Sequence, residues 1–71
     1  MNKFARMAGQ AFDYADSAFW KIRGLGETIC DDELLKDDEE TFDKVYAFED
    51  KLNAIMDELE ELIDYLEELE V

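Results

Sequence analysis

The fold is decided by residues 45–69, VYAFEDKLNAIMDELEELIDYLEEL, which contain neither Gly nor Pro. Apolar side chains recur in this stretch at alternate steps of three and four residues, at Val45, Phe48, Leu52, Ile55, Leu59, Leu62, Leu66 and Leu69. This spacing places them on one face of an α-helix and is typical of a coiled-coil seam. Phe42, Met56 and Ile63 lie beside the seam, so the apolar face is wider than a two-stranded coiled coil needs.

The start of this long helix is predicted from the acids that precede it. Asp37 is spaced as a capping residue three positions before Glu40, and Asp38 and Glu39 place further negative charge where a helix N-terminus favours it. Because no Gly or Pro follows, the sequence predicts one acidic helix over residues 38–71, about 50 Å long.

A second, near-neutral and aromatic helix is predicted over residues 1–23. Asn2 is a suitable N-cap, and Gly24 with Gly26 supplies a stop signal. The apolar face of this helix is formed by Phe4, Met7, Ala8, Ala11, Phe12, Ala15, Ala18, Phe19 and Ile22. A helix of this extent is about 30 Å long, so it is too short to cover the long helix. Residues 24–37 are interpreted as a connector or a short middle helix.

These elements predict a single all-α domain over residues 1–71 that forms a homodimeric helical bundle. A chain of 71 residues has a marginal core of its own. The part of the Leu-rich stripe that the first helix leaves uncovered therefore predicts a second copy, because twofold dimers are the commonest oligomers. The eight seam residues are the expected dimer contact.

Composition excludes several classes of chemistry. The chain has 21 acidic and 7 basic residues, a net charge of −14, one Cys and no His. Ordinary zinc sites, Ser-His or Cys-His nucleophiles and an intramolecular disulfide are therefore excluded. The acids of 31–40 lack the register of an EF-hand loop. We expect no cofactor, no metal and no enzymatic activity.

The same composition bears on compartment and partners. No apolar run approaches the length of a membrane span, and the first residues do not resemble a secretory signal, which predicts a cytoplasmic protein. The negative charge should repel nucleic acid and anionic membranes. It predicts a partner with a positively charged surface.

The charge is unevenly distributed. Residues 1–26 carry four basic and two acidic side chains, whereas residues 27–71 carry three basic and 19 acidic ones. Like-charged pairs at three- and four-residue spacing after Lys51 destabilise the long helix by about 2–4 kcal/mol. Mixed charges would keep the chain soluble without this cost, so the sequence indicates that the negative charge is itself useful. An ordinary solvated helix face is the alternative.

The charge density is that of a nucleic acid. A dimer would carry twice −14 along a helix of about 50 Å, or ~0.6 charges per Å, while duplex DNA carries one per ~1.7 Å. A protein that grips phosphates could bind such a rod. The expected protein-binding acids are Asp31, Asp32, Glu33, Asp37, Asp38, Glu39, Glu40, Asp43, Asp50, Asp57, Glu60, Glu61, Asp64, Glu67 and Glu68.

In size, charge and expected helical structure, the whole chain resembles the acidic DNA-mimic proteins encoded by bacteriophages. Most nearly it resembles the small phage inhibitors of the bacterial nucleoid protein HU. The resemblance rests on charge layout and on no shared motif. It implies a non-catalytic inhibitor that occupies the DNA-binding cleft of a basic host protein, HU first, in the host bacterial cytoplasm. The exposed acids would make the contact, and the chain would not itself bind nucleic acid.

Other interpretations stay open at this stage. The Leu seam suits a coiled-coil adapter, and an antitoxin-like neutraliser of a basic toxin is a further possibility. The aromatic and basic first helix could also lie on a membrane surface. Packing of that helix against the long helix is favoured, because anionic lipid would repel the acidic remainder. Binding measured at increasing salt distinguishes a DNA mimic from a coiled-coil adapter. A mimic loses its partner steeply as ionic strength rises, and a partner of the apolar seam does not.

Overall fold

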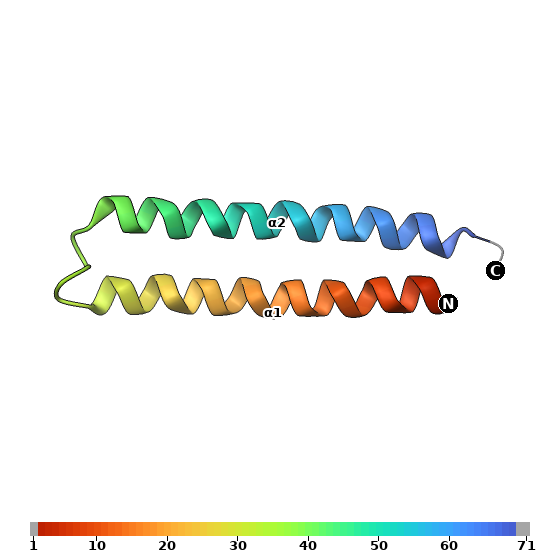
Figure 1. Cartoon of the computed structure of the whole chain (residues 1–71), viewed down its shortest axis with the longest axis horizontal. Coiled ribbons are helices and arrows are strands. Elements are labelled where there is room, and N and C mark those ends of the chain that lie inside the picture. The colour runs from red at the N-terminus through yellow and green to blue at the C-terminus, as the bar shows by residue number, and fades with distance from the viewer. Residues whose placement is uncertain (1, 70–71) are drawn as a thin grey trace.

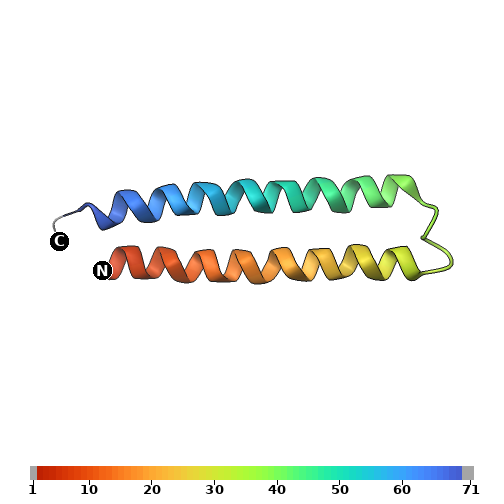
Figure 2. The same ribbon diagram turned by 180° about the vertical axis from the view of Figure 1, so that it is seen from behind.

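The computed structural model describes residues 2–69 as a hairpin of two helices, α1 (Lys3–Asp31) and α2 (Glu39–Glu67). The helices lie side by side and antiparallel, joined by a turn at residues 32–38 (Figures 1 and 2). Each helix has 29 residues, which corresponds to a length of about 43 Å. The described residues contain no strand, so the all-α prediction is confirmed.

The predicted end of the first helix at Gly24 is wrong, because α1 continues through both glycines to Asp31. Neither glycine has a positive φ. Gly26 lies against α2, where an added Cβ would be 3.6 Å from Val45 Cγ1, and Ile29 is buried one turn later. Each Gly costs a helix about 1 kcal/mol relative to Ala. The contacts with α2 that Gly26 and Ile29 add to α1 outweigh this cost. Residues 24–31 therefore belong to α1. Residues 32–38 form a turn, and not the short middle helix that was the alternative to a connector.

The equal length of the helices removes one argument for a dimer. The first helix was expected to be too short to cover the second, but α1 runs beside α2 from end to end (Figure 1). At the open end of the hairpin, the Asn2 side chain reaches the backbone of Leu66. Any surface left for a second copy must therefore lie along the sides of the hairpin.

Asp32 and Asp38 order the turn between the helices. Asp32 Oδ1 accepts hydrogen bonds from the N–H groups of Leu34 (2.8 Å) and Leu35 (3.2 Å). Asp38 caps α2, accepting from the N–H of Thr41 at 3.2 Å. The predicted cap, Asp37, is one residue early, because Asp37 still belongs to the turn. Helix α2 ends at Glu67, short of the predicted end, and Met1, Glu70 and Val71 lie outside the described residues.

The two helices meet along positions that recur at alternate steps of three and four residues. On α1 the buried and half-buried positions are Ala5, Ala8, Phe12, Ala15, Phe19, Ile22, Gly26 and Ile29, with Asn2 and Gly9 at the margin. On α2 they are Phe42, Val45, Glu49, Leu52, Met56, Leu59, Ile63 and Leu66, with Thr41 at the margin. Among the described residues only Ala5, Ile29, Leu52 and Met56 are buried outright, so the core is one thin line of contact.

The hairpin divides the predicted dimer seam into two halves. Val45, Leu52, Leu59 and Leu66 turn toward α1, whereas Phe48, Ile55, Leu62 and Leu69 are exposed. The other contacts with α1 are made by Glu49 and by the three residues that lie beside the seam in the sequence, Phe42, Met56 and Ile63. The eight residues therefore do not form one surface that a partner can reach.

The aromatic side chains of α1 divide in a similar way. Phe12 and Phe19 are half-buried in the line of contact with α2, which is the packing that the sequence favoured. Phe4 and Trp20 remain exposed, and Arg23 lies over the Trp20 ring at 5.4 Å from its centre. Part of the apolar surface of α1 is thus left open to solvent.

Candidate functional site

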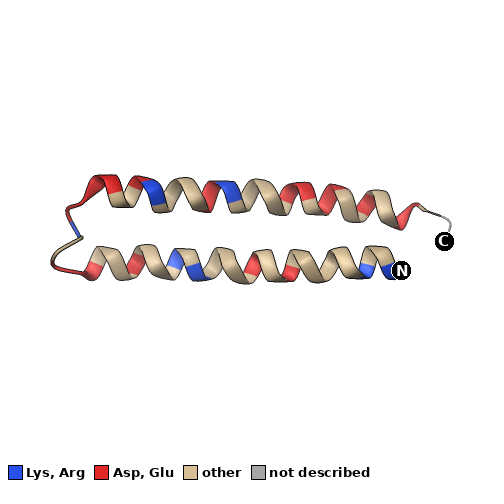
Figure 3. Ribbon diagram, viewed as in Figure 1, with Lys and Arg blue, Asp and Glu red and all other residues tan. Residues whose placement is uncertain are grey.

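Every acid that the sequence assigned to protein binding is exposed. These residues are Asp31, Asp32, Glu33, Asp37, Asp38, Glu39, Glu40, Asp43, Asp50, Asp57, Glu60, Glu61, Asp64, Glu67 and Glu68. They fall into two groups, one at the closed end of the hairpin and one along α2 toward its open end (Figure 3). The structure thus brings them together as two separate patches.

The acids of α2 are aligned by the register of the helix. Asp43, Asp50, Asp57 and Asp64 recur every seven residues, each directly after a position that contacts α1. Seven residues make nearly two turns, so these carboxylates form an almost straight line with steps of about 10.5 Å. The line lies to one side of the contact with α1 and is exposed along its length.

The density of carboxylates is highest in the C-terminal half of α2. We define the acidic face as Asp57, Glu60, Glu61, Asp64, Glu67 and Glu68, all exposed. No basic residue follows Lys51 in the sequence, and the charged residues in the C-terminal half of the α2 ribbon are all acidic (Figure 3). The charged residues of this half of α2 are therefore all negative, and the lysines of the helix, Lys44 and Lys51, lie in its other half.

The acidic face makes no ion pair within residues 2–69. The ion pair of the described chain joins Lys44 Nζ to Glu40 Oε1 at 3.4 Å, with both side chains largely exposed. It belongs to the first turns of α2, near the closed end. The six carboxylates of the acidic face are accordingly available to an external cation.

The acids at the closed end are different, because several already have local partners. The Asp32 carboxylate holds the turn, and the Asp38 carboxylate caps α2. Glu40 is the partner of Lys44. Of the two predicted patches, the one along α2 is therefore the better candidate for recognition by another molecule.

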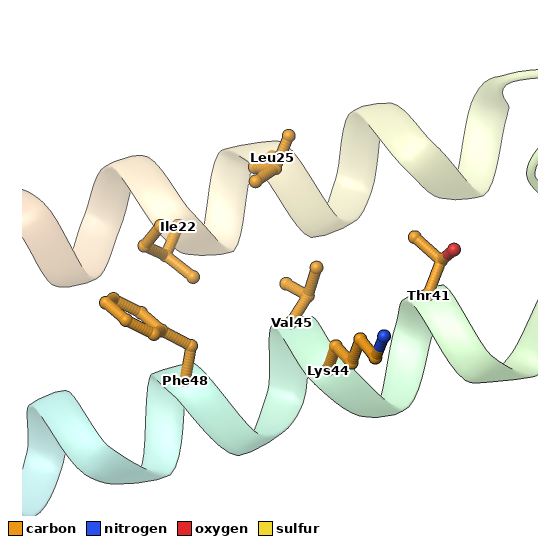
Figure 4. A pocket seen from close by; sticks show the side chains of 6 residues that line it. All are labelled: Ile22, Leu25, Thr41, Lys44, Val45 and Phe48. Atoms are coloured by element: carbon orange, nitrogen blue, oxygen red, sulfur yellow. The ribbon is translucent and has the colours of Figure 1, made fainter.

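The structure also shows a hollow that the sequence did not suggest. It holds about 290 Å³ near the closed end of the hairpin and is lined by Ile22, Leu25, Thr41, Lys44, Val45 and Phe48 (Figure 4). Its walls come from both helices and are mostly apolar. The signal that could have revealed it is Leu25, which the sequence placed beyond the end of α1 and the structure places inside it.

The acidic face offers carboxylate oxygens that attract cations and accept hydrogen bonds. Within residues 2–69 no three acidic or Cys side chains are grouped to hold a metal ion. In the same part of the chain, neither helix has the length and apolar character of a membrane span. No protein-family profile, no curated protein and no solved structure matches this chain.

Proposed function

We propose that this protein is a DNA mimic, which binds the phosphate-binding surface of a basic DNA-binding protein and thereby blocks its binding of DNA. The observation that carries this proposal is the acidic face, six exposed carboxylates of α2 that make no ion pair within the described chain. Such a surface complements clustered Lys and Arg side chains and accelerates their encounter with it.

The spacing of the carboxylates supports the proposal. The six acids of the acidic face, from Asp57 to Glu68, occupy about 16 Å of helix, or one charge per ~3 Å. One strand of DNA carries one phosphate per 3.4 Å, and the duplex carries one per ~1.7 Å. A helix held against a second helix also fixes the backbone positions of these acids, so a basic partner has only their side chains to order.

The nucleoid protein HU is our first candidate for the partner, because the chain resembles phage inhibitors of HU in size and charge. RNA polymerase, a restriction enzyme and a CRISPR nuclease offer comparable basic channels. The proposed site of action is the cytoplasm of a bacterial cell. The proposed action is competitive and needs neither cofactor nor catalysis.

A gel-shift competition tests the proposal. Purified HU is bound to labelled duplex DNA, and the protein is added at increasing concentration. The test variant replaces the centre of the acidic face by amides (Asp57→Asn, Glu60→Gln, Glu61→Gln and Asp64→Asn). The control variant removes the same number of charges elsewhere (Asp13→Asn, Asp16→Asn, Glu27→Gln and Glu58→Gln), so both variants have the same net charge.

The wild-type protein and the control variant should release DNA, whereas the test variant should need about 30-fold more protein. This factor corresponds to about 2 kcal/mol, the sum of four exposed ion pairs of moderate strength. If the two variants lose activity equally, only net charge matters and the acidic face is not the site. If the wild-type protein releases no DNA from HU, the same competition is repeated with the other basic candidates.

The alternative function, an adapter or antitoxin-like neutraliser that acts through the Leu seam, has less support. Half of that seam packs against α1 within the chain. Binding through the complete seam would require the hairpin to open. A partner captured through apolar contacts would also resist salt, whereas a partner of the acidic face should be released as the salt concentration rises.

A further inference from the structure

One side of the hairpin is lined by two rows of residues that flank the contact between the helices. On α1 the row consists of Phe4, Ala11, Ala18 and Leu25, and on α2 it consists of Thr41, Phe48, Ile55, Leu62 and Leu69. Within each row the residues recur every seven positions. Each row therefore runs nearly parallel to its helix axis from one end of the hairpin to the other.

The two rows lie on the same side. Each row directly precedes a set of contact positions, and in an antiparallel pair of helices such positions face the same side. The hollow near the closed end supports this register, because Leu25 of one row and Phe48 of the other both line it (Figure 4). On the opposite side, Arg23 and Tyr46 line a second, more polar hollow.

We call the first side the apolar face, and its large apolar side chains are exposed. The exposed fractions are 43% for Phe4, 46% for Leu25, 49% for Phe48, 45% for Ile55, 46% for Leu62 and 38% for Leu69. The hairpin that carries them is 55 Å long. Continuous apolar surface on this scale marks an interaction site in soluble proteins.

The total surface of the chain indicates how much can be covered. The chain exposes 5672 Å², whereas a globular protein of 8.3 kDa exposes about 4,600 Å². The excess is about 1,100 Å² per chain, so two chains could remove about 2,200 Å² from water by reaching globular proportions. This area lies just above the range of standard protein interfaces and at the lower end of the range of obligate dimers.

The distribution of charge permits two copies to meet on this face. The charged side chains in the rows that border it are Lys21, Lys44, Lys51 and Glu58. Their net charge is +2, although the whole chain carries −14. The acidic face lies on the other side of α2, so contact through the apolar face keeps the dense carboxylates of the two copies apart.

We propose that a second copy of the chain covers the apolar face, so that two hairpins form a four-helix homodimer with their acidic faces outward. The contact is isologous, because each copy offers the same rows to the other. An apolar side chain of the partner fills the hollow between Leu25 and Phe48. This inference does not depend on DNA mimicry, since it concerns the isolated protein.

Sedimentation equilibrium of the purified chain tests the dimer. The test variant is Ile55→Glu, at the middle of the apolar face. The control is Ala54→Glu, which adds the same charge at the neighbouring, exposed position on the outer side of α2. The wild-type protein and the control should show twice 8.3 kDa at micromolar concentration. Ile55→Glu should dissociate at least 100-fold more readily and retain its helical circular dichroism.

Other results have definite meanings. A wild-type mass of 8.3 kDa at hundreds of micromolar overturns the dimer, and equal dissociation of both variants places the contact elsewhere. If Ile55→Glu loses its helical signal, Phe48→Ala takes its place and must dissociate at least tenfold more readily than the control. Salt separates this contact from the acidic face, because higher salt should preserve the dimer and weaken binding of a basic partner.

Discussion

The Asn2 side chain links the start of α1 to Leu66 in the last turn of α2. Its Nδ2 donates a hydrogen bond to the Leu66 carbonyl oxygen at 2.7 Å, and its Oδ1 accepts one from the Ala5 N–H at 2.8 Å. One amide therefore caps α1 and holds the last turn of α2. Among the side-chain hydrogen bonds of residues 2–69, it alone joins the two helices.

Substitution of Asn2 should separate these two roles. Asn2→Asp keeps an acceptor for the cap but loses the donor to Leu66, which should lower the free energy of unfolding by about 1 kcal/mol. Asn2→Ala loses the cap as well and should cost about 2 kcal/mol in total. Urea denaturation followed by circular dichroism measures both. Equal stability of Asn2→Asp and the wild-type protein would show that the contact with Leu66 does not hold the helices together.

The continuation of α1 through Gly24 predicts the sign of another substitution. Gly24 is helical and a Cβ added there meets nothing within 4 Å. Gly24→Ala should therefore stabilise the protein by about 1 kcal/mol, the difference in helix propensity. If α1 instead ended at Gly24 in a left-handed conformation, Ala would destabilise it by a similar amount.

Gly9→Ala is the matched control for this prediction. Gly9 lies well inside α1, and an added Cβ there also meets nothing within 4 Å. Gly9→Ala should raise the free energy of unfolding by about 1 kcal/mol regardless of where α1 ends. A gain at Gly9 with a loss at Gly24 would place the end of α1 where the glycines alone suggested it.

The sequence was sufficient for the helical class, for the Asn2 cap and for a long second helix. It was not sufficient for the register of the contact. On α2, Val45 and Leu52 can pair with Phe48 and Ile55 in one seam or with Phe42 and Met56 in another, and the two seams have the same spacing. The choice depends on α1, and small residues such as Ala5 and Gly26 do not stand out in a hydrophobic pattern.

The sequence does not reveal the end of α1, because the local preference of Gly is outweighed by a contact distant in sequence. The cost of a helical Gly is about 1 kcal/mol, and Gly26 also permits the close approach to Val45. The exposure of the acids was predictable, since carboxylates are seldom buried without a partner. The local roles of Asp32 and Asp38 were not, because they depend on the backbone of the turn.

Glu49 interrupts the apolar line between the helices. It occupies a contact position and is half-buried, with Arg23, Gly26 and Tyr46 lining the same small hollow. Glu49→Leu should stabilise the hairpin by about 1 kcal/mol through partial burial of an apolar side chain. The control is Asp50→Leu at the exposed neighbouring position, which should change the urea midpoint little. A loss of stability in Glu49→Leu would show that the carboxylate itself supports the contact.

Glu61 is the residue at which stability and binding should change in opposite directions. Asp57, Glu58 and Asp64 lie four positions before, three before and three after it on α2, so it takes part in three like-charged pairs. Glu61→Gln should remove this repulsion and gain about 1 kcal/mol of stability, and Glu61→Lys, which makes the pairs attractive, should gain about 2 kcal/mol. Both gains should shrink in 0.5 M salt.

Binding of a basic partner should follow the reverse order. Glu61→Lys places a cation in the centre of the acidic face and should weaken competition with DNA about tenfold, with Glu61→Gln between it and the wild-type protein. Urea denaturation and the gel-shift competition on the same three proteins measure both properties. A solvated helix face would show the gain in stability alone. A variant that gained stability and kept full activity would therefore indicate that the negative charge serves solubility and is not the binding surface.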